Sequence, residues 1–108
     1  MPNPPVEQVL QLVKDAITQG TGLPLEANAL DIVEPRYHDS FQAKLQTPGT
    51  WDRDGANVLN AARQLGIIAT SVASLNQKPT ISQSAVVTAA DIVRTQCHIG
   101  FQEGQWCP

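Results

Sequence analysis

The chain has 108 residues, 42% of them apolar, which fits one folded domain and excludes an intrinsically disordered chain. Only 16% of the residues are charged, well below the roughly 25% usual in soluble domains, and Gln, Ser, Thr and Asn take the polar positions instead. The net charge is −3 and the seven basic residues are scattered, which excludes the basic stripe that a nucleic-acid-binding protein needs.

No segment has the pattern of a membrane span or a secretion signal. The longest apolar region, residues 56–75, is interrupted by Asn57, Asn60 and Arg63, whereas a span needs roughly 20 nearly continuous apolar residues. Residues 1–5 lack the basic start and the apolar core of a signal peptide. We therefore expect no membrane partner and, by default, a cytoplasmic location. A secreted or host-delivered protein remains the alternative, since low charge, abundant Gln and Thr and two cysteines fit it.

Helical periodicity begins immediately after the proline-rich start. Apolar residues recur at three- and four-residue spacing and predict an amphipathic helix over residues 5–19, with Pro5 as its first residue and Gly20 as its stop. The stripe consists of Val6, Val9, Leu10, Val13 and Ile17.

The next segment is ambiguous. Residues 25–34 fit a helical turn or a short strand equally well, and Pro35 disfavours helical backbone at the residue before it. Tyr37, Phe41 and Leu45 are spaced four apart, which places them on one face and predicts a second helix over residues 36–46.

Two further helices are predicted in the second half of the chain. A long apolar stripe that ends at Leu75 indicates a helix over residues 54–76, with Asp52 or Asp54 as its N-cap. Thr80 and Gln83 match a capping box and predict a helix over residues 81–97. Together the patterns predict an all-α fold: a compact four-helix bundle-like single domain over residues 1–108, with an irregular C-terminal tail packed on it.

The two cysteines allow two interpretations. Cys97 and Cys107 enclose a short loop with two glycines, so a disulfide would attach the tail to the last helix. Alternatively both are free thiols, with Cys97 a small buried apolar residue on its helix. Together with His38 and His98, the cysteines make a set of two Cys and two His, the ligand count of a common zinc site. Their spacing fits no zinc motif, so no metal ligand is assigned.

Catalytic motifs are absent from the sequence. There is no nucleophile elbow, phosphate loop or dinucleotide fingerprint, so no catalytic residue and no cofactor is predicted. One alternative function is a small ligand-binding or hydrolase-like helical protein. It would use a pocket lined by Tyr37, His38, Asp39 and Trp51, with Asp52 or Asp54 converging on it.

The charge deficit is clearest on the two predicted helices of the second half of the chain. It favours contact as the function, with these helices and the tail as the expected contact surface. Centres of protein interfaces are depleted in charge, and aromatic residues dominate their binding energy. We therefore predict a non-enzymatic protein–protein interaction module or homo-oligomer. Its candidate anchors are Trp51, Phe101 and Trp106, together with Gly66, where small residues would let another helix approach closely. The alternative is that the aromatic residues cover the edges of the core.

Overall fold

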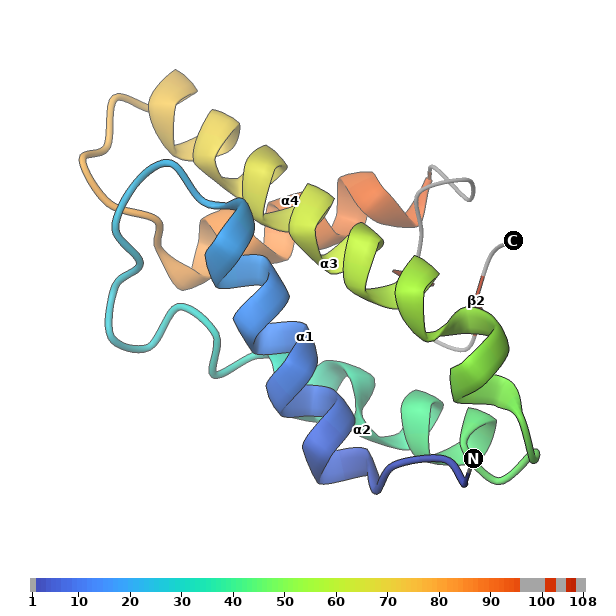
Figure 1. Cartoon of the computed structure of the whole chain (residues 1–108). Helices are drawn as coiled ribbons and strands as arrows, with labels where there is room; N and C mark the ends of the chain where they lie inside the picture. Colours follow the sequence, from blue (N-terminus) through green and yellow to red (C-terminus); the bar gives the residue numbers. More distant parts are fainter. Residues whose placement is uncertain (1, 96–100, 103–104, 107–108) are drawn as a thin grey trace.

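Four helices make up the body of the protein (Figure 1): α1 (Val6–Gly20), α2 (Val33–Lys44), α3 (Thr50–Leu75) and α4 (Gln83–Arg94). The computed structural model describes residues 2–95, and the backbone alone of residues 101–102 and 105–106. The predicted all-α single domain is confirmed. In the tail, β1 (Phe101–Gln102) and β2 (Gln105–Trp106) form a short antiparallel pair, and β1 lies against α3 and α4.

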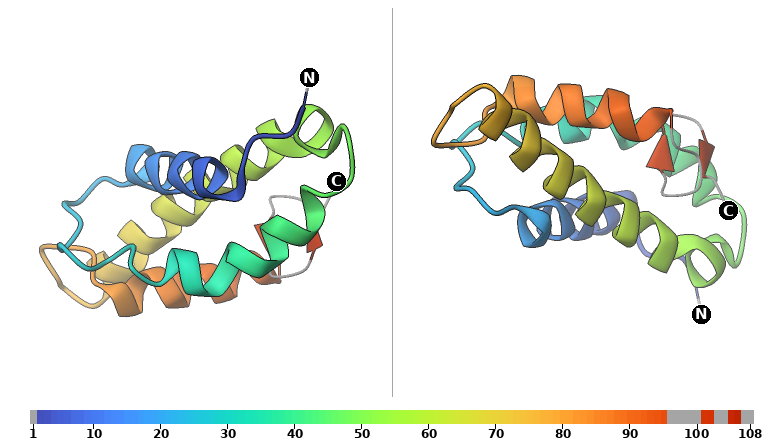
Figure 2. Two further views of the ribbon diagram at one scale, coloured as in Figure 1. Left: turned by 90° about the horizontal axis from the view of Figure 1, so that it is seen from below. Right: turned by 90° about the horizontal axis from the view of Figure 1, so that it is seen from above.

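The helices alternate in direction. Figure 2 shows that α1 and α3 run the same way and that α2 and α4 run the opposite way. α3 packs against α1 and α4, and α2 packs against α1. The end of α1 and the start of α4 therefore lie at one end of the molecule. The chain start and the α2–α3 loop lie at the other end.

The core lies between the apolar stripes of the four helices. Because the stripes repeat at helical spacing, each helix buries one face and leaves the opposite face to solvent. The largest side chains that are almost wholly buried are Phe41, Leu10, Ile17, Leu65, Ile81, Val9, Val13, Val33, Val58, Val86 and Val93. Leu75, which the sequence placed on the apolar stripe of the third helix, is instead 83% exposed, because it lies in the last turn beyond the core.

The crossing of α1 and α3 depends on two glycines. A Cβ on Gly66 would lie 2.2 Å from the carbonyl oxygen of Ile17, and a Cβ on Gly20 would lie 2.1 Å from that of Arg63. The two backbones are therefore too close for any side chain at either position. The close helix approach predicted at Gly66 does exist, but α1 of the same chain occupies it.

The second helix begins earlier than predicted. α2 starts at Val33, so Glu34 and Pro35 both lie in its first turn. The N–H of Arg36 donates the first helical hydrogen bond, to the carbonyl of Ile32. Because Pro35 comes before Arg36, its missing N–H removes no hydrogen bond of the helix. Residues 25–34 are neither a full helix nor a strand: Leu25 makes one isolated parallel bridge to Ile81, and turns follow.

The third helix also begins earlier, at Thr50 in place of residue 54. Its N-cap is Gly49, with a left-handed φ of 80°, and neither Asp52 nor Asp54 caps it. Asp52 lies instead in the first turn, where a negative charge is favourable near the helix N-terminus. The side chain that accepts a first-turn N–H comes from Asn3, far away in the sequence.

The fourth helix is shorter than predicted. Its N-cap is Ser82, whose hydroxyl accepts from the backbone N–H of Ala85 at 3.3 Å, and the capping box based on Thr80 was wrong. The hydroxyl of Thr80 donates to Glu26 and the amide of Gln83 donates to the carbonyl of Asn28. Both residues thus join the loop after α1 to the start of α4. The helix ends at Arg94, three residues before the predicted end.

One described helix, α3, is long and apolar enough to cross a membrane by length and composition alone. Central helices of folded domains meet the same criteria. In this fold α1 and α4 both pack on α3, and its inner face includes the buried residues Val58, Leu65 and Ala69.

Candidate functional site

The residues of the predicted pocket near Tyr37 do not converge. Tyr37 is only 3% exposed, and its ring stacks on Phe41 with 5.6 Å between ring centroids. It is a core residue. The adjacent His38 faces outward, and its Nδ1 lies 3.0 Å from the fully exposed carboxylate of Asp39. These two residues form a solvated surface pair.

Trp51 lies apart from them, in the first turn of α3. Its indole is half-buried and covers Gly55, where an added Cβ would lie 2.7 Å from the ring. Of four surface hollows found in residues 2–95, one is lined by Trp51 and none is lined by Tyr37 or His38. The geometry therefore gives no support to the hydrolase-like alternative.

Among the predicted interaction anchors, Gly66 is corrected by the structure. It is buried under α1, so no external helix can reach it. Trp51 keeps a partly exposed ring. The side chains of Phe101 and Trp106 lie outside the described residues, as do Cys97 and Cys107. Their roles as anchors and as a disulfide or free thiols remain predictions from the sequence.

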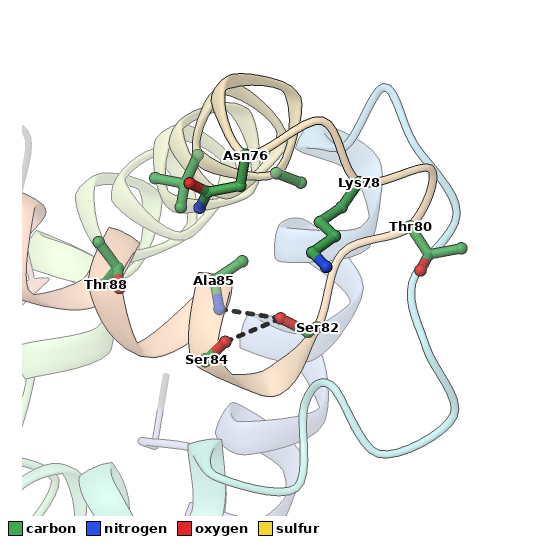
Figure 3. Close-up of a pocket in the computed structure, with 9 residues that line it drawn as sticks. Asn76, Lys78, Thr80, Ser82, Ser84, Ala85 and Thr88 are labelled. Carbon is green, nitrogen blue, oxygen red and sulfur yellow. Dashed lines mark hydrogen bonds between the residues drawn. The ribbon is translucent and has the colours of Figure 1, made fainter.

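A hollow of about 300 Å³, less open to solvent than the other three, lies between the end of α3 and the start of α4. We call it the α3–α4 corner. Figure 3 shows its side chains, which come from the last turns of α3, the connecting loop and the first turns of α4. The corner is lined by Val72, Ala73, Asn76, Lys78, Thr80, Ser82, Ser84, Ala85 and Thr88.

Hydroxyl and amide groups dominate this corner. The hydroxyl of Ser82 lies 3.0 Å from that of Ser84 and also caps α4 through the N–H of Ala85 (Figure 3). Such groups both donate and accept hydrogen bonds, so they can pair with neutral polar groups of a partner. Lys78 supplies the one charge of the lining, and no carboxylate, imidazole or thiol is present in it. The lining of the corner can therefore form hydrogen bonds with a partner, but it contains no acid–base pair.

The corner lies in the part of the chain with the fewest charged residues. Residues 64–90 contain a single charged residue, Lys78, and they form the second half of α3, the loop and most of α4. On the same two helices, Leu75 is 83% exposed, and Ile67 and Ile92 are each more than one-third exposed. Neutral polar groups flanked by accessible apolar side chains are typical of the centre of an interface.

Sequence reasoning missed the corner itself, although it pointed to the helices that form it. A usable signal was present in the uncharged run of residues 64–90. The position of Ser82 at the turn into α4 was concealed by the stronger-looking capping box at Thr80.

Metal chemistry finds no support in residues 2–95. Within that part of the chain, no three His, Cys, Asp or Glu side chains come close enough together to hold an ion. No protein-family model, curated protein or solved structure matches this chain.

Proposed function

We propose that the protein is a non-enzymatic helical interaction module that associates with a second copy of itself through the α3–α4 corner. The single observation that carries the proposal is that the end of α3 combines a surface of low charge with the 83% exposed side chain of Leu75.

A second copy is the partner that this chemistry favours. Hydroxyl and amide groups are donors and acceptors at once, so a surface made of them is complementary to itself across a two-fold axis. A surface rich in one sign of charge would repel its own copy. The corner holds one Lys and no acid, and Lys78 is exposed at its rim, where it can stay hydrated in a dimer.

Light scattering after size-exclusion chromatography, over a range of concentrations, tests this proposal. We expect the mass to rise from the chain mass of 11.6 kDa to twice that value as concentration increases. Leu75→Glu places a charge in the proposed interface, so that variant should remain at the chain mass. At a concentration where the wild type is also monomeric, its unfolding temperature should match that of the wild type, because Leu75 contributes little to the core.

Ala43→Glu is the matched control. Ala43 is exposed on α2, away from the corner, so the added charge should leave dimerisation intact. A wild-type chain that remains monomeric at millimolar concentration would refute self-association. A dimer that both variants form equally well would refute the corner as its interface.

A further inference from the structure

Asn3 connects three parts of the chain at the end of the molecule opposite the α3–α4 corner. Its side-chain amide donates to the carbonyls of Leu45 at 2.7 Å and Thr47 at 2.8 Å. Its side-chain oxygen accepts from the backbone N–H of Trp51 at 3.0 Å. One residue near the chain start therefore satisfies the carbonyls just after α2 and a donor in the first turn of α3.

These bonds replace a cap that α3 lacks. The first N–H groups of a helix have no partner within it, and the N-cap side chain usually accepts one of them. Here the N-cap is Gly49, which has no side chain. Asn3 acts as the missing cap from a distant segment, so the first turn of α3 depends on residues 2–4.

Residues 2–4 are held mainly through Asn3, whereas Pro5 is fixed as the N-cap of α1, where its carbonyl accepts from Gln8 and Val9. Pro2 and Pro4 have no backbone N–H to donate. Hollows of about 310, 280 and 390 Å³ surround the segment, so it does not fill the space beneath it. The largest of them lies between this segment and Trp51. Segments with few packed apolar contacts open more readily than the core does.

We infer that residues 2–4 form a releasable strap that caps α3 only while Asn3 is docked. In the docked state the Trp51 N–H is bonded, and its half-buried indole lines the hollow beside the strap. When the strap is released, the first turn of α3 loses this cap and the indole becomes more exposed. The strap is a conformational device built into the fold, and it is independent of the proposed dimer.

Amide hydrogen exchange of the folded full chain tests the strap. In Asn3→Ala, we expect exchange of the Trp51 amide to become about tenfold faster or more, because the variant removes all three hydrogen bonds. The Leu65 amide, in the middle of α3, should keep its rate. In a Trp106→Phe background Trp51 is the remaining tryptophan, and its fluorescence should shift to longer wavelength when Asn3 is replaced.

Asn57→Ala is the control, since it removes an exposed asparagine farther along the same helix. It should change neither signal. Unchanged exchange and fluorescence in Asn3→Ala would overturn the inference. An equal acceleration at Trp51 and Leu65 would also overturn it, because Asn3 would then support the whole fold and not a local strap.

Discussion

Gly20 and Gly66 lie next to each other where α1 crosses α3. At each position the backbone of the other helix occupies the space that a side chain would need. A Cβ built on Gly66 would lie 3.2 Å from the carbonyl carbon of Gly20. This contact sets how closely the two most extensively packed helices approach each other, and every other helix is placed relative to this pair.

Replacing either glycine of the crossing should destabilise the protein markedly. In an unhindered helix, Gly→Ala is favourable by about 1 kcal/mol. Here the new methyl group would meet a backbone carbonyl oxygen, which cannot rotate away, so overpacking dominates. We expect Gly66→Ala and Gly20→Ala each to cost about 2 kcal/mol or more, measured by urea denaturation.

Gly22→Ala provides the comparison for the crossing. An added Cβ there would lie 3.5 Å from a methyl group of Thr70, an ordinary contact, so its stability should stay within about 0.5 kcal/mol of wild type. A Gly66→Ala variant that is as stable as Gly22→Ala would contradict the tight crossing.

The end of α3 offers a stabilising substitution. Gln77 has a left-handed φ of 57°, and the N–H groups of Gln77 and Lys78 bond back to the carbonyls of Ser74 and Ala73. This is a Schellman motif, in which the left-handed position normally belongs to glycine. Gln77→Gly should therefore raise the free energy of unfolding by about 0.5–1 kcal/mol. Asn76→Gly, one residue earlier at an ordinary φ of −89°, should lower it.

The stacked pair on α2 should behave as core. Phe41 is fully buried against Tyr37, so Phe41→Ala should cost about 3–5 kcal/mol and leave a cavity. His38→Ala, one position after Tyr37, should change stability by less than about 0.5 kcal/mol because the histidine faces solvent. Thermal denaturation of the two variants separates a core role from a surface role. A large loss of stability in His38→Ala would contradict the surface role of this histidine.

The ion pair between α2 and α4 should contribute modestly and in a salt-dependent way. The guanidinium of Arg36 is largely covered and bonds to Asp91, whose carboxylate is 55% exposed. Asp91→Asn should lower stability by about 0.5–1 kcal/mol at low salt. The loss should shrink at 1 M salt, where the screening length falls to about 3 Å. Asp39→Asn removes a fully exposed carboxylate and should have no measurable effect. Equal losses at low and high salt would exclude an electrostatic contribution.

The sequence predicted correctly the helix whose ends are determined by neighbouring residues. The bounds of α1 were correct within one residue because its stripe, its initial proline and its final glycine all lie in the same stretch. The start of α3 was missed because Gly49 provides no side-chain signal and the capping side chain comes from Asn3. The start of α2 was missed because Pro35 was interpreted as a barrier, although a first turn tolerates it.

The candidate site was predicted only at the level of helices. The low charge of the second half of the chain pointed to the helices that form the α3–α4 corner, but periodicity assigned Leu75 to the apolar stripe. Periodicity cannot tell where the core ends in space. The structure shows that the last turn of α3 extends beyond the core. Which residues meet at the α3–α4 corner depends on how the chain turns between the two helices, and no spacing in the sequence encodes that.

The bridge between Leu25 and Ile81 limits how the loops of this protein can vary. Surface loops usually accept insertions because their backbone groups bond to water. Here the N–H of Ile81 donates to the carbonyl of Pro24 at 2.8 Å, and the N–H of Glu26 donates to the carbonyl of Ile81 at 2.9 Å. An added residue in either loop would shift one side of this pairing and pull the fully buried Ile81 out of register. Length variation among natural or designed versions of this chain should therefore concentrate outside these two loops.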